Sequence, residues 1–164
     1  MGAGCGVQGV QRMRPLWASC IALWASCIIF SAAAQEFKPL TRDEIVVRLV
    51  LQEANNEPFD GMVAVAGTVF DRVEDNRWPN TIRDVAYQPY QYEGMVRRIR
   101  PYSRAAITKA RAAVAVSRDG ARPCGRVLWY HNFTVYPKWA QSYKIACVIG
   151  GHIFYTDGKD WTHE

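Results

Sequence analysis

Hydrophobic residues recur at helical spacing after residue 40, and this pattern predicts two successive helices. Residues 41–44, Thr-Arg-Asp-Glu, match a capping box with the threonine as N-cap, so we expect a helix over residues 41–56. Pro58 should end this helix, because the residue before a proline avoids helical dihedral angles. A second helix is predicted over residues 60–73, with Asp60 as its N-cap. It is apolar around most of its circumference, which indicates a central, buried helix.

Toward the C-terminus the pattern changes from helix to strand. Residues 74–94 are polar and interrupted by proline, so they are predicted to form a loop with at most one helical turn. Ser103 can cap a third helix over residues 104–118, and Gly120 can end it. Segments rich in Val, Ile, Tyr and Trp predict three strands, 126–133, 143–149 and 152–156, with a hairpin at Gly150-Gly151. Helices followed by a small antiparallel sheet indicate an α+β domain.

The first 34 residues have the pattern of a secretory signal peptide. A short basic region precedes residues 15–34, which carry no charged side chain and end in three alanines. We therefore expect cleavage after Ala34, a linker over residues 35–40 and one domain over residues 41–164. A retained signal anchor is the alternative, because about 20 uncharged residues can span a bilayer.

Composition and charge narrow the classes of function. The chain is 49% hydrophobic and 21% charged, as globular proteins are, and it contains neither a P-loop nor a dinucleotide-binding glycine motif. The leader holds Arg12 and Arg14 and no acid, so without it 18 basic residues face 15 acidic ones and the net charge is +3. This mild charge gives no reason to expect nucleic acid as a partner. One run of basic residues could bind an anionic polymer or a membrane surface, and the alternative is a solvated helix face. The run consists of Arg97, Arg98, Arg100, Arg104, Lys109 and Arg111.

Two cysteines remain after the leader, Cys124 and Cys147, and an even number in an exported protein favours a disulfide. The bond would close a loop of about 24 residues and add roughly 3 kcal/mol to the free energy of unfolding. Cys124 precedes the first predicted strand and Cys147 lies in the second, so antiparallel pairing can bring their Cα atoms within the required ~4.4–6.8 Å. Two buried free thiols are the alternative.

One carboxylate interrupts the apolar face of the first predicted helix. Glu53 follows Ile45 and Leu49 at four-residue intervals, so the three side chains lie on one side of the helix. A carboxylate there faces the core or a cleft cut into it, and desolvation raises its pKa. An acid that stays protonated near neutral pH suits glycosidic-bond cleavage, because the leaving oxygen must receive a proton. The alternative is a structural glutamate in a core ion pair or helix cap.

A second glutamate lies close by in the sequence. Glu57 is one turn beyond Glu53 if the helix continues that far, which would suit a glycosidase with two carboxylates. The alternative is an exposed and inert glutamate at the end of the helix, just before Pro58.

Several short motifs follow one another in a recognisable order. They read E-A-N-N-E-P-F-D-G-M-V-A-V-A at 53–66, V-F-D-R-V at 69–73, W-P-N-T-I at 78–82, V-A-Y-Q-P-Y-Q-Y at 85–92, L-W-Y-H-N at 128–132, Trp139, and I-G-G-H-I-F-Y at 149–155. The set resembles the SleB/CwlJ-type cell wall hydrolase family, with its E-A-R-G-E-P-x-x-G-Q-x-A-V-A, V-x-N-R-V, F-P-x-T-I, V-x-Y-Q-P-x-Q-F, A-L-Y-F-Y-N and I-G-x-H-x-F-Y elements. The match covers about residues 43–156.

The resemblance implies a lysozyme-like α+β domain that cleaves the glycan strands of peptidoglycan. Members resemble lytic transglycosylases, in which one glutamate is the general acid and the substrate's own 6-hydroxyl closes a 1,6-anhydro ring in place of water. The family's catalytic glutamate is the first residue of E-A-R-G-E and corresponds to Glu53. Asn55-Asn56 stands where the family has Arg-Gly, which changes the charge beside the acid and leaves rate and substrate preference open.

Further residues are candidates for substrate binding, together with Glu57. Gln91 and Tyr92 lie in a proline-bounded loop that can line a sugar cleft, because amides pair well with N-acetyl and hydroxyl groups. Tyr87 or Trp129 can stack on a pyranose face, with core packing as the alternative for each ring.

The sequence gives little support to a metal site. The chain has three histidines, and a zinc site would need His131 and His152, facing each other across the sheet, plus a carboxylate, with no ligand spacing in support. We expect no metal and no other cofactor, and we interpret His152 as a core histidine with satisfied hydrogen bonds.

These observations predict an exported, monomeric enzyme of the periplasm or cell wall that acts on peptidoglycan. We expect it to cleave the MurNAc–GlcNAc β-1,4 bond with Glu53 as acid and then base, and to touch a membrane only through an uncleaved leader. A zinc-dependent N-acetylmuramoyl-L-alanine amidase and a catalytically inactive wall-binding module are the alternatives. The sequence does not separate a transglycosylase from a hydrolase, because the participation of one water molecule decides between them.

Overall fold

The computed structural model describes residues 39–96 and 101–159. The chain divides into two units, Met1–Phe37 and Lys38–Glu164, and every described residue belongs to the second. The predicted signal peptide or anchor over residues 1–34 lies outside the described residues, as do most of the linker and part of the basic run.

No helix among the described residues is long and apolar enough to cross a lipid bilayer.

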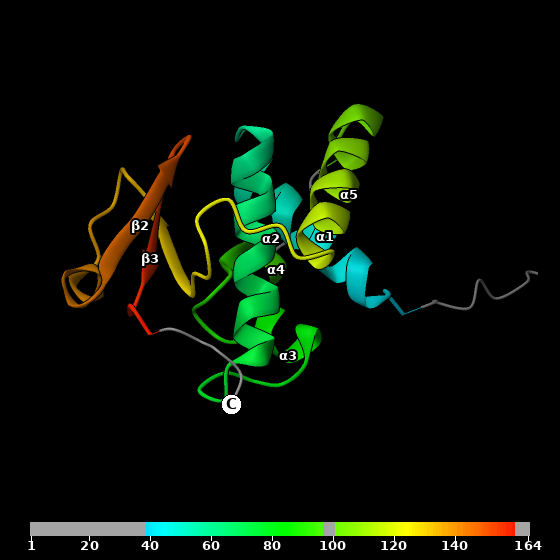
Figure 1. The fold of residues 1–164 in the computed structure, drawn as a ribbon. Coiled ribbons are helices and arrows are strands. Elements are labelled where there is room, and N and C mark those ends of the chain that lie inside the picture. Colours follow the sequence, from blue (N-terminus) through cyan, green and yellow to red (C-terminus); the bar gives the residue numbers. More distant parts are fainter. Residues whose placement is uncertain (1–38, 97–100, 160–164) are drawn as a thin grey trace, which may run out of the picture. The chain divides into compact units, whose positions relative to one another are not determined.

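Three helices supply most of the hydrophobic core: α1 (Arg42–Ala54), α2 (Phe59–Glu74) and α5 (Arg104–Arg118). The predicted ranges agree with them to within two residues. Thr41 caps α1 through the predicted capping box, Ser103 caps α5, and Gly120 follows α5 with a left-handed φ of 104°. α2 packs against both other helices and lies between them and the sheet (Figure 1). Its central position explains why every residue from Gly61 to Val69 is buried.

The start of α2 differs from the prediction. The helix begins at Phe59 with Pro58 in the cap position, and no side chain caps its first N–H groups, so Asp60 is not the N-cap. Proline suits this place because its fixed φ is compatible with a helix start and it has no N–H of its own to satisfy. Asp60 lies in the first turn instead, where its negative charge interacts favourably with the helix dipole.

The segment between α2 and α5 contains two short helices rather than a loop with at most one turn. α3 (Ile82–Ala86) begins after Thr81, whose side chain accepts a hydrogen bond from the backbone N–H of Asp84. α4 (Glu93–Val96) follows after the proline-containing loop. Both helices pack against α1. Such short helices depend on these tertiary contacts, because isolated helices of this length are unstable.

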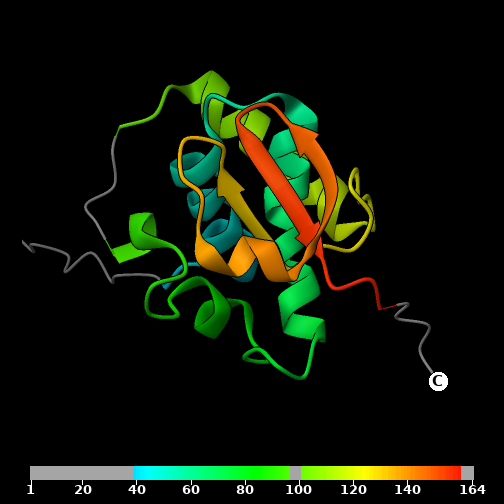
Figure 2. The ribbon, with the colours of Figure 1, turned by 90° about the vertical axis from the view of Figure 1, so that its left-hand side faces the viewer.

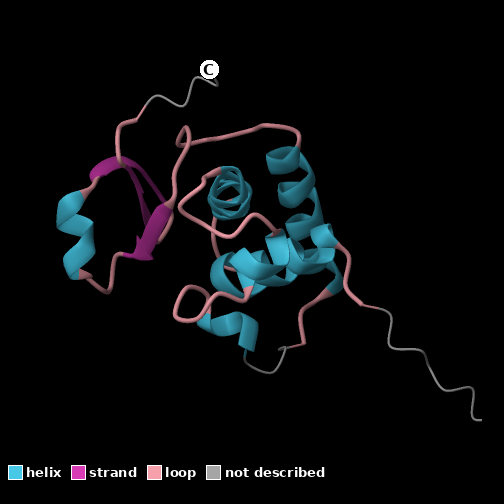
Figure 3. Cartoon of the chain, turned by 90° about the horizontal axis from the view of Figure 1, so that it is seen from below, coloured by secondary structure: helices cyan, strands magenta, loops and turns pink. Residues whose placement is uncertain are grey.

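The sheet has three antiparallel strands, β1 (Trp129–Asn132), β2 (Lys144–Ile149) and β3 (His152–Thr156), in the order β1-β3-β2. The α+β class is therefore confirmed. Figure 2 looks onto the sheet and shows β3 between the two edge strands. A 3-10 helix that the sequence did not predict, η1 (Lys138–Ser142), connects β1 to β2 and lies on the face of the sheet turned away from the helices (Figure 3).

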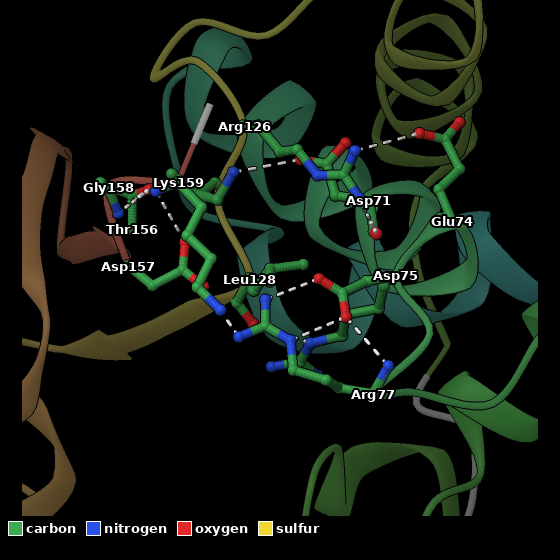
Figure 4. Close-up of polar contacts among 12 residues, drawn as sticks. Asp71, Glu74, Asp75, Arg77, Arg126, Leu128, Thr156, Asp157, Gly158 and Lys159 are labelled. Atoms are coloured by element: carbon green, nitrogen blue, oxygen red, sulfur yellow. Dashed lines mark hydrogen bonds and ion pairs between the residues drawn. The ribbon is translucent and has the colours of Figure 1, made fainter. Parts of the chain in front are cut away.

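β1 begins three residues later than predicted, because side chains of α2 bind the backbone that precedes it. Asp71 accepts a hydrogen bond from the N–H of Val127 at 3.1 Å, and Arg72 donates one to the carbonyl oxygen of Leu128 at 2.8 Å. Arg126 in turn donates to the backbone oxygen of Asp71 at 3.1 Å (Figure 4). These bonds replace strand pairing and hold the sheet at a fixed place against α2.

A second link joins the end of α2 to the end of β3. Arg77 forms ion pairs with the buried Asp75 at 2.7 Å and with Asp157 at 2.8 Å (Figure 4). Asp75 is the residue that follows the last turn of α2, and Asp157 directly follows β3. Arg77 therefore fixes both elements at the same end of the domain.

Cys124 and Cys147 form the predicted disulfide, with Cα atoms 5.4 Å apart. The expected reason for their proximity was wrong, because β1 and β2 do not pair and Cys124 lies outside any strand. Cys147 is paired with Phe154 of β3 instead. The bond thus joins the segment before one edge strand to the other edge strand.

Candidate active site

An open cavity of about 810 Å³ lies where the C-terminal turn of α1, the α3–α4 loop and the β1 edge of the sheet meet. This volume is in the upper part of the ~300–1,000 Å³ range of ligand sites. Its lining mixes aromatic rings with amides, an arginine and one carboxylic acid. The lining residues are Gln52, Glu53, Arg72, Trp78, Tyr90, Gln91, Tyr92, Trp129, Tyr130, His131, Asn132, Val135, Pro137, Trp139, Tyr143 and His152.

Glu53 enters this cavity from the last turn of α1. Ile45 and Leu49, its neighbours on the same helix face, are buried in the core, so Glu53 marks the place where that face reaches the cavity. The backbone of α4 covers one side of the acid, since a Cβ added at Gly94 would lie 3.2 Å from Oε1 of Glu53 and 2.6 Å from Oε1 of Gln52. Among the described residues that line the cavity, Glu53 is the only carboxylic acid.

Tyr130 contributes a buried hydroxyl to the same cavity. Its ring packs against His152 and Phe154, with centroids 5.2 Å and 5.5 Å away, and its hydroxyl has no hydrogen-bond partner among the described residues. Burial raises the pKa of Tyr130 well above its ordinary value, and the nearby Tyr92 and Glu53 raise it further. The hydroxyl therefore stays protonated and able to donate. Buried polar groups normally have partners, so an unpaired one beside a cavity points to a bound ligand or water.

A buried arginine holds part of the cavity wall in place. Arg72 donates to the hydroxyl of Tyr92 at 2.9 Å, and its guanidinium lies 4.0 Å from the ring centroid of Trp78. Together with its bond to Leu128, these contacts fix rings from two separate loops around one side chain of α2. The result is a pre-formed wall rather than a set of loose loops.

A cluster of aromatic rings continues from this wall along the outer face of the sheet. Trp129 stacks on Tyr143 with centroids 3.8 Å apart, and Trp78 meets the edge of Trp129 at 6.5 Å. Trp139 of η1 lies 6.2 Å from Tyr143 and 5.5 Å from Tyr155. Residues from both faces of β1 reach the cavity, because β1 is an edge strand.

The structure brings four of the six predicted acid or substrate-binding residues to one cavity: Glu53, Gln91, Tyr92 and Trp129. Tyr92 presents a ring that is almost entirely buried, whereas Gln91 is exposed. Tyr87 is not part of the lining. It packs against the core, and its hydroxyl accepts a hydrogen bond from Arg48 at 3.4 Å.

Glu57 also lies outside the cavity lining. Its carboxylate accepts a hydrogen bond from the N–H of Gly151 at 2.8 Å, and its other oxygen is 3.6 Å from Nδ1 of His152. The side chain is 14% exposed. Glu57 thus contacts the turn between β2 and β3.

The two histidines of the sheet do not face each other. His131 is paired with Ile153 and His152 with Asn132, so the two side chains point to opposite faces of the sheet. His131 Nε2 shares a hydrogen bond with the hydroxyl of Tyr155 at 2.8 Å. Nδ1 of His152 has no hydrogen-bond partner among the described residues, so the expectation of satisfied hydrogen bonds was wrong. Burial lowers the pKa of His152, although the Glu57 carboxylate opposes this.

Within the described part of the chain, no group of three or more His, Cys, Asp and Glu side chains is arranged to hold a metal ion.

Arg72, Tyr90, Tyr130 and Trp139 also line the cavity, although the sequence predicted no substrate-binding role for any of them. Tyr130 and Trp139 each belong to one of the ordered motifs, which was the available signal. Arg72 also lies in such a motif, but its role depends on contacts with residues 20 and 56 positions away.

Comparison with known proteins gives a consistent family. The sequence profile of the Cell Wall Hydrolase family matches residues 56–155, starting three residues after Glu53. Spore cortex-lytic enzymes from Oceanobacillus iheyensis and Bacillus cereus are 30% and 31% identical over 116 residues. These alignments cover 68% of this chain and 40% and 42% of the relatives, so the chain spans about two fifths of their length.

Two solved structures have the same fold. One is the catalytic domain of the germination-specific lytic transglycosylase SleB from Bacillus anthracis, with a TM-score of 0.61 and 27% identity over 74% of this chain and 98% of that one. The other is the catalytic domain of the Bacillus cereus SleB protein, with a TM-score of 0.59 and 27% identity over 73% and 94%. The likeness confirms the lysozyme-like α+β fold. With the profile matching more than half of its residues, the chain belongs to the Cell Wall Hydrolase family.

Proposed function

We propose that this protein cleaves the glycan strands of peptidoglycan at the MurNAc–GlcNAc β-1,4 bond, as a lytic transglycosylase with Glu53 as general acid and base. The observation that carries the proposal is the position of Glu53, the one carboxylic acid among the described residues lining a large cavity of aromatic and amide side chains. The names of its relatives, a spore cortex-lytic enzyme and a lytic transglycosylase, support it.

Glu53 acts twice in the proposed reaction. Protonated, it gives its proton to the glycosidic oxygen, so that the bond from C1 of MurNAc to O4 of GlcNAc breaks and GlcNAc leaves with a free 4-hydroxyl. The 6-hydroxyl of the same MurNAc then attacks C1, and the Glu53 carboxylate takes the proton that this hydroxyl loses. The product ends in a 1,6-anhydro ring, and the acid has returned to its starting state.

The surroundings of Glu57 favour this single-acid scheme. Glycosidases with two carboxylates place both groups around the scissile bond, at separations of roughly 5–9.5 Å across the substrate. Glu57 is instead engaged with the backbone of Gly151 and lies outside the cavity lining. We assign Glu57 and Tyr87 to the support of the site and not to the chemistry.

Four side chains are proposed to bind the substrate around the acid. Gln91 offers an amide to N-acetyl and hydroxyl groups, and the Tyr130 hydroxyl donates to an oxygen of the bound sugar. Trp129 and Tyr92 supply apolar walls that the aromatic cluster and Arg72 keep rigid. In ligand sites with apolar walls, a few polar contacts fix the orientation of the ligand, and we expect the same for the sugar here.

The proposed substrate places the protein outside the cytoplasm, and the disulfide supports an oxidising compartment. The acid and the walls of the cavity all come from one chain, so we propose a monomer that acts alone on the wall. Contact with a membrane would come through the leader if it is retained.

Mass spectrometry of the soluble products from purified sacculi tests the proposal. Anhydro-muropeptides are expected; hydrated muropeptides would indicate a hydrolase, and free peptides released in a chelator-sensitive way would indicate an amidase. Glu53→Gln keeps the shape of the side chain but carries no proton to give, so it should lower the cleavage rate by about 10²- to 10⁴-fold. Its melting temperature should match that of the parent. If Glu53→Gln retained half of the parent activity, Glu53 would not be the catalytic acid.

A further inference from the structure

Tyr90 has an unusual backbone and an unusual exposure. Among the described residues it is the only one other than glycine with a positive φ, 65°, and it is 98% exposed. The left-handed conformation costs a side chain with a Cβ about 1–2 kcal/mol, a cost that glycine avoids. A ring this exposed gains almost nothing from packing, so protein stability does not account for a tyrosine at this position.

Tyr90 nevertheless lines the Glu53 cavity. It comes from the α3–α4 loop, directly after Pro89 and before Gln91. The motif that this segment resembles, V-x-Y-Q-P-x-Q-F, leaves the position of Tyr90 open, so the motif itself does not call for a tyrosine there. Residues held in sparsely populated conformations are often found at functional sites.

A second exposed ring lines the same cavity from the sheet side. Trp139 is 37% exposed and lies on η1, which the sheet separates from the helices (Figure 3). Its ring is held by His131 at 5.7 Å and by Tyr155 at 5.5 Å, both in edge-to-face contact. Trp139 therefore has a fixed orientation, and part of its surface is left uncovered.

We propose that Tyr90 and Trp139 form an aromatic clamp for the pyranose rings of a bound glycan strand. A pyranose ring has C–H groups on its two faces and hydroxyls around its rim. Aromatic faces carry negative charge density and attract such C–H groups, while the amides of the same cavity can bind the rim. The inference rests on the proposed function, because it names the glycan strand of peptidoglycan as the occupant.

The clamp assigns the two rings a specific task. They hold sugars of the strand at the open part of the cavity while Glu53 acts at the scissile bond. The site consequently selects a polymeric glycan over a short fragment, because a fragment that ends before the clamp loses its contacts.

Tyr90→Asn is a suitable test, because asparagine tolerates the left-handed conformation and the fold should be at least as stable as the parent. Binding is measured by calorimetry in the Glu53→Gln background, with peptide-free glycan strands prepared from amidase-treated sacculi as the probe. Loss of the ring should weaken binding by about tenfold, which corresponds to about 1.4 kcal/mol. Trp139→Leu, which keeps an apolar side chain without a flat face, should weaken it similarly.

Phe59→Ala is the matched control, since Phe59 is also 37% exposed but lies outside the cavity lining. It should bind the glycan as the Glu53→Gln parent does. If Tyr90→Asn and Trp139→Leu both bind within twofold of the parent, or if Phe59→Ala loses as much as they do, the clamp is wrong.

The inference and the proposed function fail in different ways. If the protein with Glu53 intact releases no glycan product but the Glu53→Gln protein binds strands in a Tyr90-dependent manner, the clamp stands and the catalytic proposal falls. If anhydro-products form at an unchanged KM in Tyr90→Asn and Trp139→Leu, the catalytic proposal stands and the clamp falls.

Discussion

Glu57 accepts a hydrogen bond from the backbone N–H of Gly151 over 2.8 Å, although 94 positions separate the two residues. The bond joins the segment just after α1, which carries Glu53, to the turn of the β2–β3 hairpin. Gly150 makes the approach possible, because its φ is 57° and a Cβ at this position would overlap the Glu57 carboxylate. The two layers that form the cavity are therefore tied together beside it.

Replacing Glu57 should weaken the fold more than the chemistry. Glu57→Ala leaves the partly buried N–H of Gly151 without its partner, so the free energy of unfolding should fall by about 1–3 kcal/mol in urea titrations. The rate of glycan cleavage per folded molecule should fall by less than about tenfold, far less than in Glu53→Gln.

Glu74→Ala is the control for this prediction. Glu74 is 54% exposed and pairs with Arg126 at 3.7 Å, so its loss should cost less than about 1 kcal/mol. A cleavage defect in Glu57→Ala as severe as that of Glu53→Gln would instead require a mechanism with two carboxylates.

The helices could be predicted from the sequence because their signals are local. The spacing of Ile45, Leu49 and Glu53 places an acid on a buried helix face whatever the rest of the chain does. The caps Thr41 and Ser103 mark the helix starts in the same way, through bonds to residues three positions away.

The rest of the site depends on contacts that link distant parts of the chain. The bond of Glu57 to Gly151, the bonds that shorten β1 and the strand order β1-β3-β2 leave no periodic trace in the sequence. The same is true of Tyr130, which lies in a four-residue strand where alternation is too short to assign a face. For this reason Glu53 could be placed in advance, whereas most of its surroundings could not.

Tyr130→Phe should lower activity without lowering stability. The phenyl ring keeps the contacts with His152 and Phe154, and the change removes a buried hydroxyl that has no partner among the described residues. The free energy of unfolding should stay the same or rise, and cleavage should slow by about tenfold if one hydrogen bond to substrate is lost.

Tyr87→Phe serves as the comparison, because the Tyr87 hydroxyl bonds to Arg48 and lies outside the cavity lining. It should cleave sacculi at the parent rate. Full activity in Tyr130→Phe would show that the substrate does not use this hydroxyl.

The disulfide should contribute substantially to the stability of the sheet. Cys124 and Cys147 are 23 positions apart, and the chain-entropy account predicts roughly 3 kcal/mol for a loop of this size. The double variant Cys124→Ser/Cys147→Ser should show this decrease in non-reducing urea titrations. Dithiothreitol should bring the parent down to the level of the double variant and leave the variant itself unchanged. A parent that is equally stable with and without reductant would contradict the prediction.

His152 should make the stability of the domain depend on pH. Burial is the largest cause and lowers the pKa of His152 below the ordinary 6.5. The charge of His131 lowers this pKa further, whereas the Glu57 carboxylate raises it. Between the lowered pKa and 6.5 the unfolded chain binds a proton that the folded chain does not bind. The free energy of unfolding therefore falls as the pH drops below about 6.5, by at most about 1.4 kcal/mol per pH unit from this one group.

His152→Gln removes this dependence, because glutamine does not bind a proton in this pH range. Urea titrations from about pH 8 down to about pH 5 give the difference in unfolding free energy between parent and variant at each pH. That difference should be constant above about pH 7.5, where His152 is neutral in both states, and should shift against the parent as the pH falls. If the two curves run parallel throughout, His152 keeps its ordinary proton affinity in the fold, and the desolvation assigned to it is offset by Glu57.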